Sequence, residues 1–155
     1  MRLTTKSRYG TRAIFDIAYN SVGMPVQIKD ISKRQEIPPR YLEQIFHKLK
    51  GANIINSVRG PGGGYLLARD PSKITVGDII KAMKEPIDPV FCVEDENENN
   101  KKCSRAEQCV TKQVWKEAGE KITKYFNSVS IRDLCERAKS MGVKKDMKHP
   151  FDYNI

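Results

Sequence analysis

A run of glycines between two short apolar segments constrains the fold of this chain most strongly. Residues 54–59 alternate in a way that is typical of a strand, and residues 65–68 predict a returning strand. Residues 60–64, with the sequence Gly-Pro-Gly-Gly-Gly, form a connection that marks a turn. These residues therefore predict a β-hairpin with an unusually glycine-rich tip.

Helical segments precede this hairpin. Apolar residues recur at helical spacing over residues 8–19, and a second helical stretch covers residues 28–34. Pro38 or Pro39 is placed to open a third helix in its first turn, where proline is favoured. Two short helices around a tight turn indicate a helix-turn-helix, and the hairpin that follows makes it a winged helix. We expect this DNA-binding domain to span residues 1–84.

The second half of the chain predicts a loop followed by helices. A short helix is expected over residues 76–83, and residues 85–109 read as an exposed, cysteine-bearing loop with an acidic run. From residue 106 to 128 apolar side chains repeat about every four residues, so a helix of roughly six turns is predicted. Such a helix needs a packing partner, and a second subunit is the natural candidate.

The expected fold class is mainly α with a small β-hairpin wing. The winged helix-turn-helix is followed by a long dimerisation helix and a shorter one within residues 106–140. Residues 141–155 form a basic tail that we expect to be poorly ordered.

The positive charge of the chain is concentrated in its first half. The 155 residues include 28 Lys and Arg against 19 Asp and Glu, a net charge of +9, and residues 1–70 contribute 12 against 5. This excess favours a polyanionic partner, such as nucleic acid or an anionic membrane surface, and the N-terminal half as its reader. No stretch approaches the ~18 apolar residues of a membrane span, and no export signal is expected, so we predict a cytoplasmic protein that does not engage a membrane.

The third predicted helix has one apolar and one polar face. Leu42, Ile45, Phe46 and Leu49 form the apolar stripe, and the opposite face presents Arg40, Glu43, Gln44 and His47. Arginine can fork to guanine, glutamine can pair with adenine, and glutamate accepts from cytosine while repelling phosphates. The polar face therefore predicts base reading in a major groove, although an ordinary solvated helix face has the same composition.

The hairpin adds a second candidate DNA contact. Ser57 and Arg59 precede the tip, and Gly60, Gly62 and Gly63 would let the backbone approach a sugar-phosphate chain or let Arg59 enter a minor groove. The alternative is a flexible hairpin without a ligand. A helix-turn-helix directly before it favours the DNA contact.

Three of the four cysteines lie close together in sequence. Cys92, Cys103 and Cys109 lack the close pairs of zinc ribbons and the compact run of bacterial ferredoxins. Thiolates on a loop suit an iron-sulfur cluster whose loading reorders the segment, and three unligated thiols are the alternative. Cys135 falls in an apolar helical pattern and is expected to be a small buried hydrophobic residue.

The chain resembles IscR-type iron-sulfur cluster regulators, which belong to the Rrf-two superfamily of winged helix-turn-helix transcription regulators. The resemblance covers most of the chain, and its wing string is highly specific. It rests on residues 1–4, 8–9, 41–44, 57–67, 76–77 and 109–111, and on Cys92 and Trp115.

The resemblance implies a homodimer whose long helices cross and whose winged helices each read half of a promoter palindrome in double-stranded DNA. It adds Tyr41, within the matching segment, to the candidate DNA-contacting residues. It also implies a 2Fe-2S cluster on Cys92, Cys103 and Cys109 that reports iron-sulfur status to genes of cluster assembly, with exchange of clusters with assembly proteins. The residue matching Glu43 governs which class of DNA site such proteins accept.

This sequence departs from the pattern at the fourth cluster ligand. The family has a histidine three residues after the last cysteine, whereas this chain has Lys112, which cannot ligate iron when protonated. The fourth ligand is therefore unknown. Candidates are a partner residue or an acidic side chain of the chain itself: Glu94, Asp95, Glu96, Glu98 or Glu107.

Three other functions are open at this point. A cluster-free regulator of cysteine or sulfur metabolism from the same superfamily would keep the DNA binding. A nitric-oxide-sensing repressor would hold a 4Fe-4S cluster, but such proteins have an acidic residue near position 8, where this chain has Arg8. An iron-sulfur electron carrier or redox enzyme would leave the wing unexplained, so we do not expect an enzyme.

Overall fold

The computed structural model of the chain describes residues 3–21, 23–93, 105 and 108–146. Its elements, in chain order, are α1 (Thr5–Asn20), α2 (Ile28–Gln35), α3 (Pro39–Gly51), β1 (Ile55–Val58), β2 (Gly64–Leu67), the 3₁₀ turn η1 (Pro71–Lys73), α4 (Val76–Ala82), the 3₁₀ turn η2 (Phe91–Val93), α5 (Val110–Ser128) and α6 (Ile131–Ser140). The predicted fold class, helical with one small hairpin wing, is confirmed.

Local sequence signals set the helix boundaries. Pro39 occupies the first turn of α3, as its fixed φ favours. Thr75 and Asp78 form a reciprocal capping box at the start of α4, and Ser130 and Asp133 form another at the start of α6. The long helix expected from residue 106 begins only at Val110, so α5 is shorter than its apolar pattern predicts.

The hairpin consists of two antiparallel strands in which Ile55 pairs with Leu67 and Val58 pairs with Gly64. Tyr65 extends this pairing through an isolated bridge to Val26, with backbone N–H···O distances of 2.9 and 2.8 Å. The Tyr65 ring also packs edge to face against the Phe46 ring, with 4.6 Å between the two ring centroids. The base of the wing is therefore fastened both to α3 and to the segment before α2.

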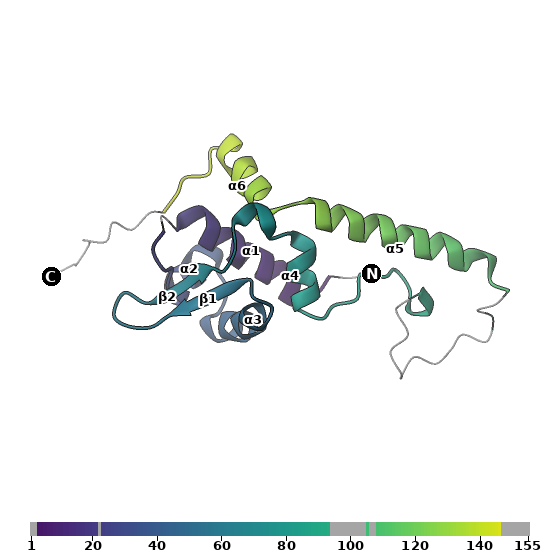
Figure 1. The fold of residues 1–155 in the computed structure, drawn as a ribbon, viewed down its shortest axis with the longest axis horizontal. Coiled ribbons are helices and arrows are strands. Elements are labelled where there is room, and N and C mark those ends of the chain that lie inside the picture. The colour runs from purple at the N-terminus through teal and green to yellow at the C-terminus, as the bar shows by residue number, and fades with distance from the viewer. Residues whose placement is uncertain (1–2, 22, 94–104, 106–107, 147–155) are drawn as a thin grey trace.

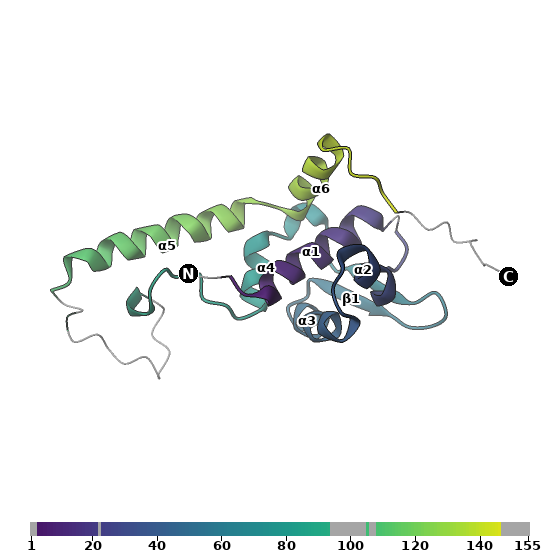
Figure 2. The same cartoon turned by 180° about the vertical axis from the view of Figure 1, so that it is seen from behind.

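One hydrophobic core unites the winged helix. α1 runs through its centre and contacts α2, α3, α4, α6 and β2. The largest fully buried side chains include Ile14, Ile17, Phe46, Leu49 and Ile79. Both views show α3 and the hairpin on one side of α1 and α6 on the other (Figure 1, Figure 2).

α5 extends away from this body, at the end opposite the wing tip (Figure 1). Gly119 is its one buried residue, while Val110, Val114, Trp115 and Tyr125 remain more than 40% exposed. The chain then returns to the body, because Val76 N–H donates to the Val129 carbonyl at 2.9 Å. No helix in the described part of the chain is long and apolar enough to cross a membrane.

The first residues of the predicted tail contact the body. The Tyr19 hydroxyl donates to the Val143 carbonyl at 2.7 Å, and the Lys145 ammonium lies 5.2 Å from the Tyr19 ring centroid. An Asp146 carboxylate oxygen lies 3.3 Å from Arg34 Nη1. Residues 147–155, with His149, lie outside the described residues, and the predicted domain boundaries remain a prediction.

Candidate nucleic-acid interface

The exposed face of α3 is formed by the residues that its periodicity indicates. Leu42, Ile45, Phe46 and Leu49 are at most 2% exposed and fix the helix on the core. Arg40, Glu43, Gln44 and His47 are all exposed on the opposite face. We call these four residues the reading face. The side chains of this set are free to meet base edges, and their donors and acceptors match those that a major groove presents.

Tyr41 lies at the margin of the reading face. It is half-buried, and its ring meets the Tyr9 ring edge to face at a centroid distance of 5.7 Å. The Arg12 guanidinium lies 5.5 Å from the centroid of Tyr9 on α1. Tyr41 therefore connects the start of α3 to α1, a structural contact that the sequence did not predict.

A buried carboxylate holds α2 against α1. Asp16 is fully buried and accepts hydrogen bonds from Arg34 Nη2 at 2.7 Å, Arg34 Nε at 3.0 Å and Gln35 Nε2 at 2.9 Å. The hydrogen bond from Arg34 to Asp16 raises the pKa of the guanidinium, against the opposing effect of burial. Arg12 adds a donor to the Gln35 carbonyl. This network holds the C-terminal end of α2 against α1. α3 begins four residues after α2 ends.

The wing presents Ser57 and Arg59 beside the reading face. Both are exposed, and the Ser57 hydroxyl accepts from Lys50 Nζ on α3 at 2.7 Å. Lys50 was not among the residues that the sequence singled out. This hydrogen bond connects β1, the strand that precedes Arg59, to one side of α3.

The glycines of the wing have different physical roles. Gly60 adopts a φ of 110°, which side chains other than glycine rarely accept. A Cβ on Gly63 would lie 2.4 Å from the Val58 carbonyl oxygen, so this turn closes only around a glycine. A Cβ on Gly62 would meet nothing within 4 Å. Within the described residues no contact requires glycine at position 62.

Two of the three predicted cluster cysteines lie within the described residues. Cys92 lies in η2 and Cys109 at the N-cap of α5, and both are half-buried free thiols. Cys103 lies outside the described residues, as do the acidic candidates Glu94, Asp95, Glu96, Glu98 and Glu107. No group of three metal-ligating side chains occurs in the part of the chain that the structure describes.

The surroundings of Cys109 lower the pKa of its thiol. A hydrogen bond with the Thr111 hydroxyl, at 3.4 Å, lowers the pKa of its thiol, and backbone N–H groups and the charge of Lys112 act in the same direction. By contrast, burial raises the pKa of Cys135, which packs against the core but is half-buried and not fully buried as its apolar pattern predicts. The two thiols are therefore chemically distinct.

Glu85 links the start of the cysteine-bearing segment to α1. Its carboxylate accepts from the Thr4 backbone N–H at 3.2 Å, from the Thr4 hydroxyl and from the buried Ser7 hydroxyl at 2.6 Å. Glu85 follows α4, seven residues before Cys92. This carboxylate therefore joins the start of the cysteine-bearing segment to the first turn of α1.

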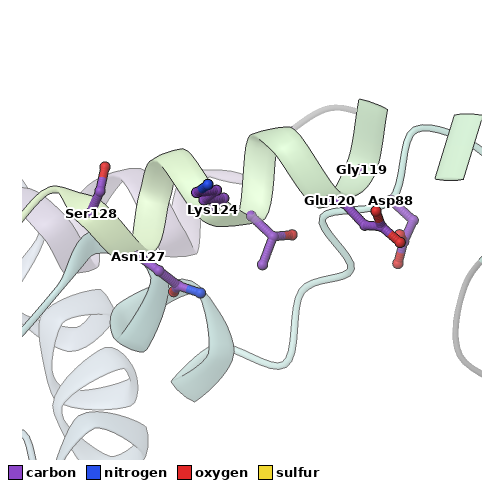
Figure 3. A pocket seen from close by; sticks show the side chains of 7 residues that line it. Asp88, Gly119, Glu120, Lys124, Asn127 and Ser128 are labelled. Atoms are coloured by element: carbon purple, nitrogen blue, oxygen red, sulfur yellow. The ribbon is translucent and has the colours of Figure 1, made fainter. Parts of the chain in front are cut away.

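A polar groove of about 590 Å³ lies where α5 passes the segment before η2. Figure 3 shows Asp88 and Glu120 at one end of it and Asn127 and Ser128 at the other. Gly119 permits this passage, because a Cβ there would come within 2.9 Å of an Asp88 carboxylate oxygen. The glycine that carries this close approach could not be identified from sequence periodicity.

Comparisons with known proteins agree with this arrangement. Residues 3–137 match the family Rrf2, described as an iron-dependent transcriptional regulator. The chain is 38% identical over 152 residues to the HTH-type transcriptional regulator IscR of Citrobacter koseri, a match that covers 98% of this chain and 90% of the relative.

Solved structures of regulators also resemble this chain. The structure of IscR from T. potens has a TM-score of 0.72 at 33% identity and covers 94% of this chain and 93% of its own. The structure of CymR, the global cysteine regulator of B. subtilis, has a TM-score of 0.70 at 28% identity, with 88% and 98% coverage. The relatives are regulators, which confirms the prediction that the chain is not an enzyme.

Proposed function

Because the chain belongs to the Rrf2 family of transcriptional regulators, we propose that it binds a promoter palindrome as a homodimer and senses iron-sulfur cluster status through Cys92, Cys103 and Cys109. Its targets would be genes of cluster assembly, and assembly proteins would exchange clusters with it. The observation that carries the DNA-binding part is the exposed reading face of α3 beside an exposed wing that carries Arg59.

The proposed DNA contacts divide into base reading and backbone positioning. Arg40 and Gln44 would donate to base edges, and His47 would extend the contact along α3. Glu43 would accept from cytosine and repel phosphates, so it would select among sites more than it strengthens binding. Arg59, at the exposed wing, would enter the adjacent minor groove or bind its phosphates.

We assign dimerisation to α5. Val110 is 89% exposed, Val114 57%, Trp115 41% and Tyr125 57%, which is an unusual amount of apolar surface on one helix. A twofold axis would let α5 pack on its copy and bury these side chains in an isologous interface. Two reading faces related by that axis match the symmetry of a DNA palindrome.

We assign the cluster to the segment between η2 and the start of α5. The residues fit it in two respects: Cys92 and Cys109 are free and partly accessible, and the lowered pKa of Cys109 favours the thiolate that iron requires. Cys103 would be the third ligand and the fourth is unknown, since Lys112 replaces the family histidine. A bound cluster, most simply 2Fe-2S, supplies a redox-active group that holds cysteine-bearing segments together.

Regulation would pass from this segment to the reading head through contacts of the chain itself. Glu85 holds Thr4 and Ser7 at the start of α1, and α1 carries both α3 and the Asp16 network. Cluster binding by Cys92, Cys103 and Cys109 would bias the position of this carboxylate and hence of α1. The DNA preference would then differ between cluster-bound and cluster-free forms.

The cluster is tested by purification without oxygen, followed by visible spectroscopy and iron and sulfide analysis. Wild-type protein should be coloured and contain near-stoichiometric sulfide, and Cys92→Ala should lose both. The Cys135→Ala variant is the matched control and should keep the cluster, because this thiol packs against the core. A colourless, iron-free wild-type protein would contradict the assignment.

A cluster-free regulator of cysteine or sulfur metabolism is the second candidate. Lys112 in the place of the family histidine and the likeness to a cysteine regulator favour it. It retains every DNA contact proposed above. A colourless dimer that still binds DNA with high affinity would identify this alternative.

A further inference from the structure

A basic groove lies beside the C-terminal half of α3. It has a volume of about 880 Å³ and is lined by that half of α3, by the residues that follow it, by α4, and by Arg69 just after β2. Among the described residues, its charged lining consists of Lys48, Arg69, Lys81 and Lys84 against the single carboxylate of Asp78. His47 of the reading face also lines it, so the groove continues directly from the reading face.

The one carboxylate leaves most of this charge unbalanced. Asp78 accepts from the Thr75 backbone N–H at 3.0 Å in the α4 capping box and lies 3.8 Å from Arg69 Nη2. Lys81 and Lys84 are exposed, and neither ammonium forms an ion pair within the described residues. Two unengaged ammonium groups therefore face solvent beside the helix that is proposed to read DNA.

The two flanks of α3 are both basic. At about 100° per residue, Lys48 and Lys50 fall roughly 80° to either side of the centre of the reading face. Their contacts agree with this placement, since Lys50 Nζ donates to Ser57 on the wing at 2.7 Å and Lys48 Nζ lies 3.5 Å from the Met83 carbonyl beside α4. α3 is thus bordered by the wing on one flank and by α4 on the other.

This arrangement matches the surroundings of a helix in a major groove. Such a helix has a phosphodiester backbone on each side, and phosphate contacts on both sides fix its register. The wing flank supplies Lys50 and Arg59 for one backbone. We propose that Lys48, Lys81 and Lys84 bind phosphates of the other backbone, outside the bases that the reading face contacts.

This inference rests on the proposed DNA binding and extends its contact surface to α4. DNA is the partner that the geometry favours, because the groove is open and continuous with the reading face. A free anion or an acidic protein would not require that continuity.

The test compares the salt dependence of DNA binding by full-length wild-type protein and the double variant Lys81→Gln/Lys84→Gln. The probe is a duplex selected by the wild-type protein from a random-sequence pool. Removal of two phosphate contacts should reduce the slope of log K against log salt by about 2 for each bound subunit. Phosphate-ethylation interference should disappear at one edge of each half-site, while sequence preference is kept.

Two matched variants isolate the position of the charge. Lys81→Arg/Lys84→Arg should restore the wild-type slope, because guanidinium also binds phosphate. Lys73→Gln/Lys139→Gln removes the same charge from exposed positions in η1 and α6, on the other side of α1, and should leave the interference pattern unchanged.

An unchanged slope and interference pattern in Lys81→Gln/Lys84→Gln would overturn the inference while leaving the proposed function intact. Loss of binding to an acidic protein, with DNA binding unaltered, would overturn it as well. Failure of the wild-type protein to select any duplex would instead remove the proposed function on which the inference rests.

Discussion

Replacement of Asp16 should cost this small protein a large part of its stability. The carboxylate is fully buried and accepts from both Arg34 and Gln35, and the Arg34 side chain is itself only 15% exposed. In the Asp16→Ala variant, the one carboxylate that Arg34 would keep among the described residues is Asp146, which lies 3.3 Å away and is 58% exposed. A mostly buried guanidinium would then lack its principal counterion.

Removal of one partner of a buried ion pair typically destabilises a protein by about 3–5 kcal/mol. We expect the lower part of that range, about 3 kcal/mol, because Arg34 retains some solvent and one remaining carboxylate. For a chain of this size the change corresponds to a decrease of about 6–12 °C in Tm. Since α2 leads directly into α3, DNA affinity should also fall at temperatures where the variant remains folded.

Urea unfolding followed by circular dichroism, at one fixed protein concentration, measures this difference. Asp146→Ala is the matched control, because it removes the exposed carboxylate that contacts the same guanidinium, and it should cost no more than about 1 kcal/mol. A loss below about 1 kcal/mol in Asp16→Ala, or equal losses in the two variants, would refute the reasoning.

Arg59→Ala should weaken binding at most DNA sites and lower the salt slope by about 1 for each subunit, and an unchanged slope in a salt titration would argue against the wing contact. Glu43→Ala should relax sequence preference more than it lowers affinity; competition with single-base variants of a selected duplex would show this, and wild-type discrimination would count against it. Val114→Glu should shift the protein toward monomer in sedimentation analysis, whereas a stable dimer would place the interface elsewhere. Thr111→Val should raise the pKa of Cys109 and slow its alkylation by iodoacetamide near neutral pH, as followed by peptide mass spectrometry, and equal rates would exclude the hydroxyl as the cause.

The sequence predicted the elements that depend on local patterns. The apolar stripe of α3, from Leu42 to Leu49, defines its buried face, so the exposure of Glu43 and Gln44 follows from helical periodicity. The glycine-rich tip predicted the wing for the same reason, because turn residues act within a few positions of one another.

The contacts missed by the sequence join positions that are distant along the chain. Asp16 meets Arg34 across 18 residues, and Glu85 meets Ser7 across 78, so no periodic pattern connects them. The basic groove likewise arises only when α3, which carries Lys48, packs against α4, which carries Lys81. The start of α5 was predicted four residues too early, because the spacing of apolar residues shows which face of a helix is apolar but does not show at which residue the helix begins.

Selection from a random-sequence duplex pool, with protein kept under anaerobic conditions, tests the central claim most directly. The account predicts enrichment of a palindrome whose half-sites lie about one helical turn apart, or a multiple of it, and a changed preference after the cluster is removed. Recovery of duplexes with no shared sequence, under both conditions, would contradict base reading by α3.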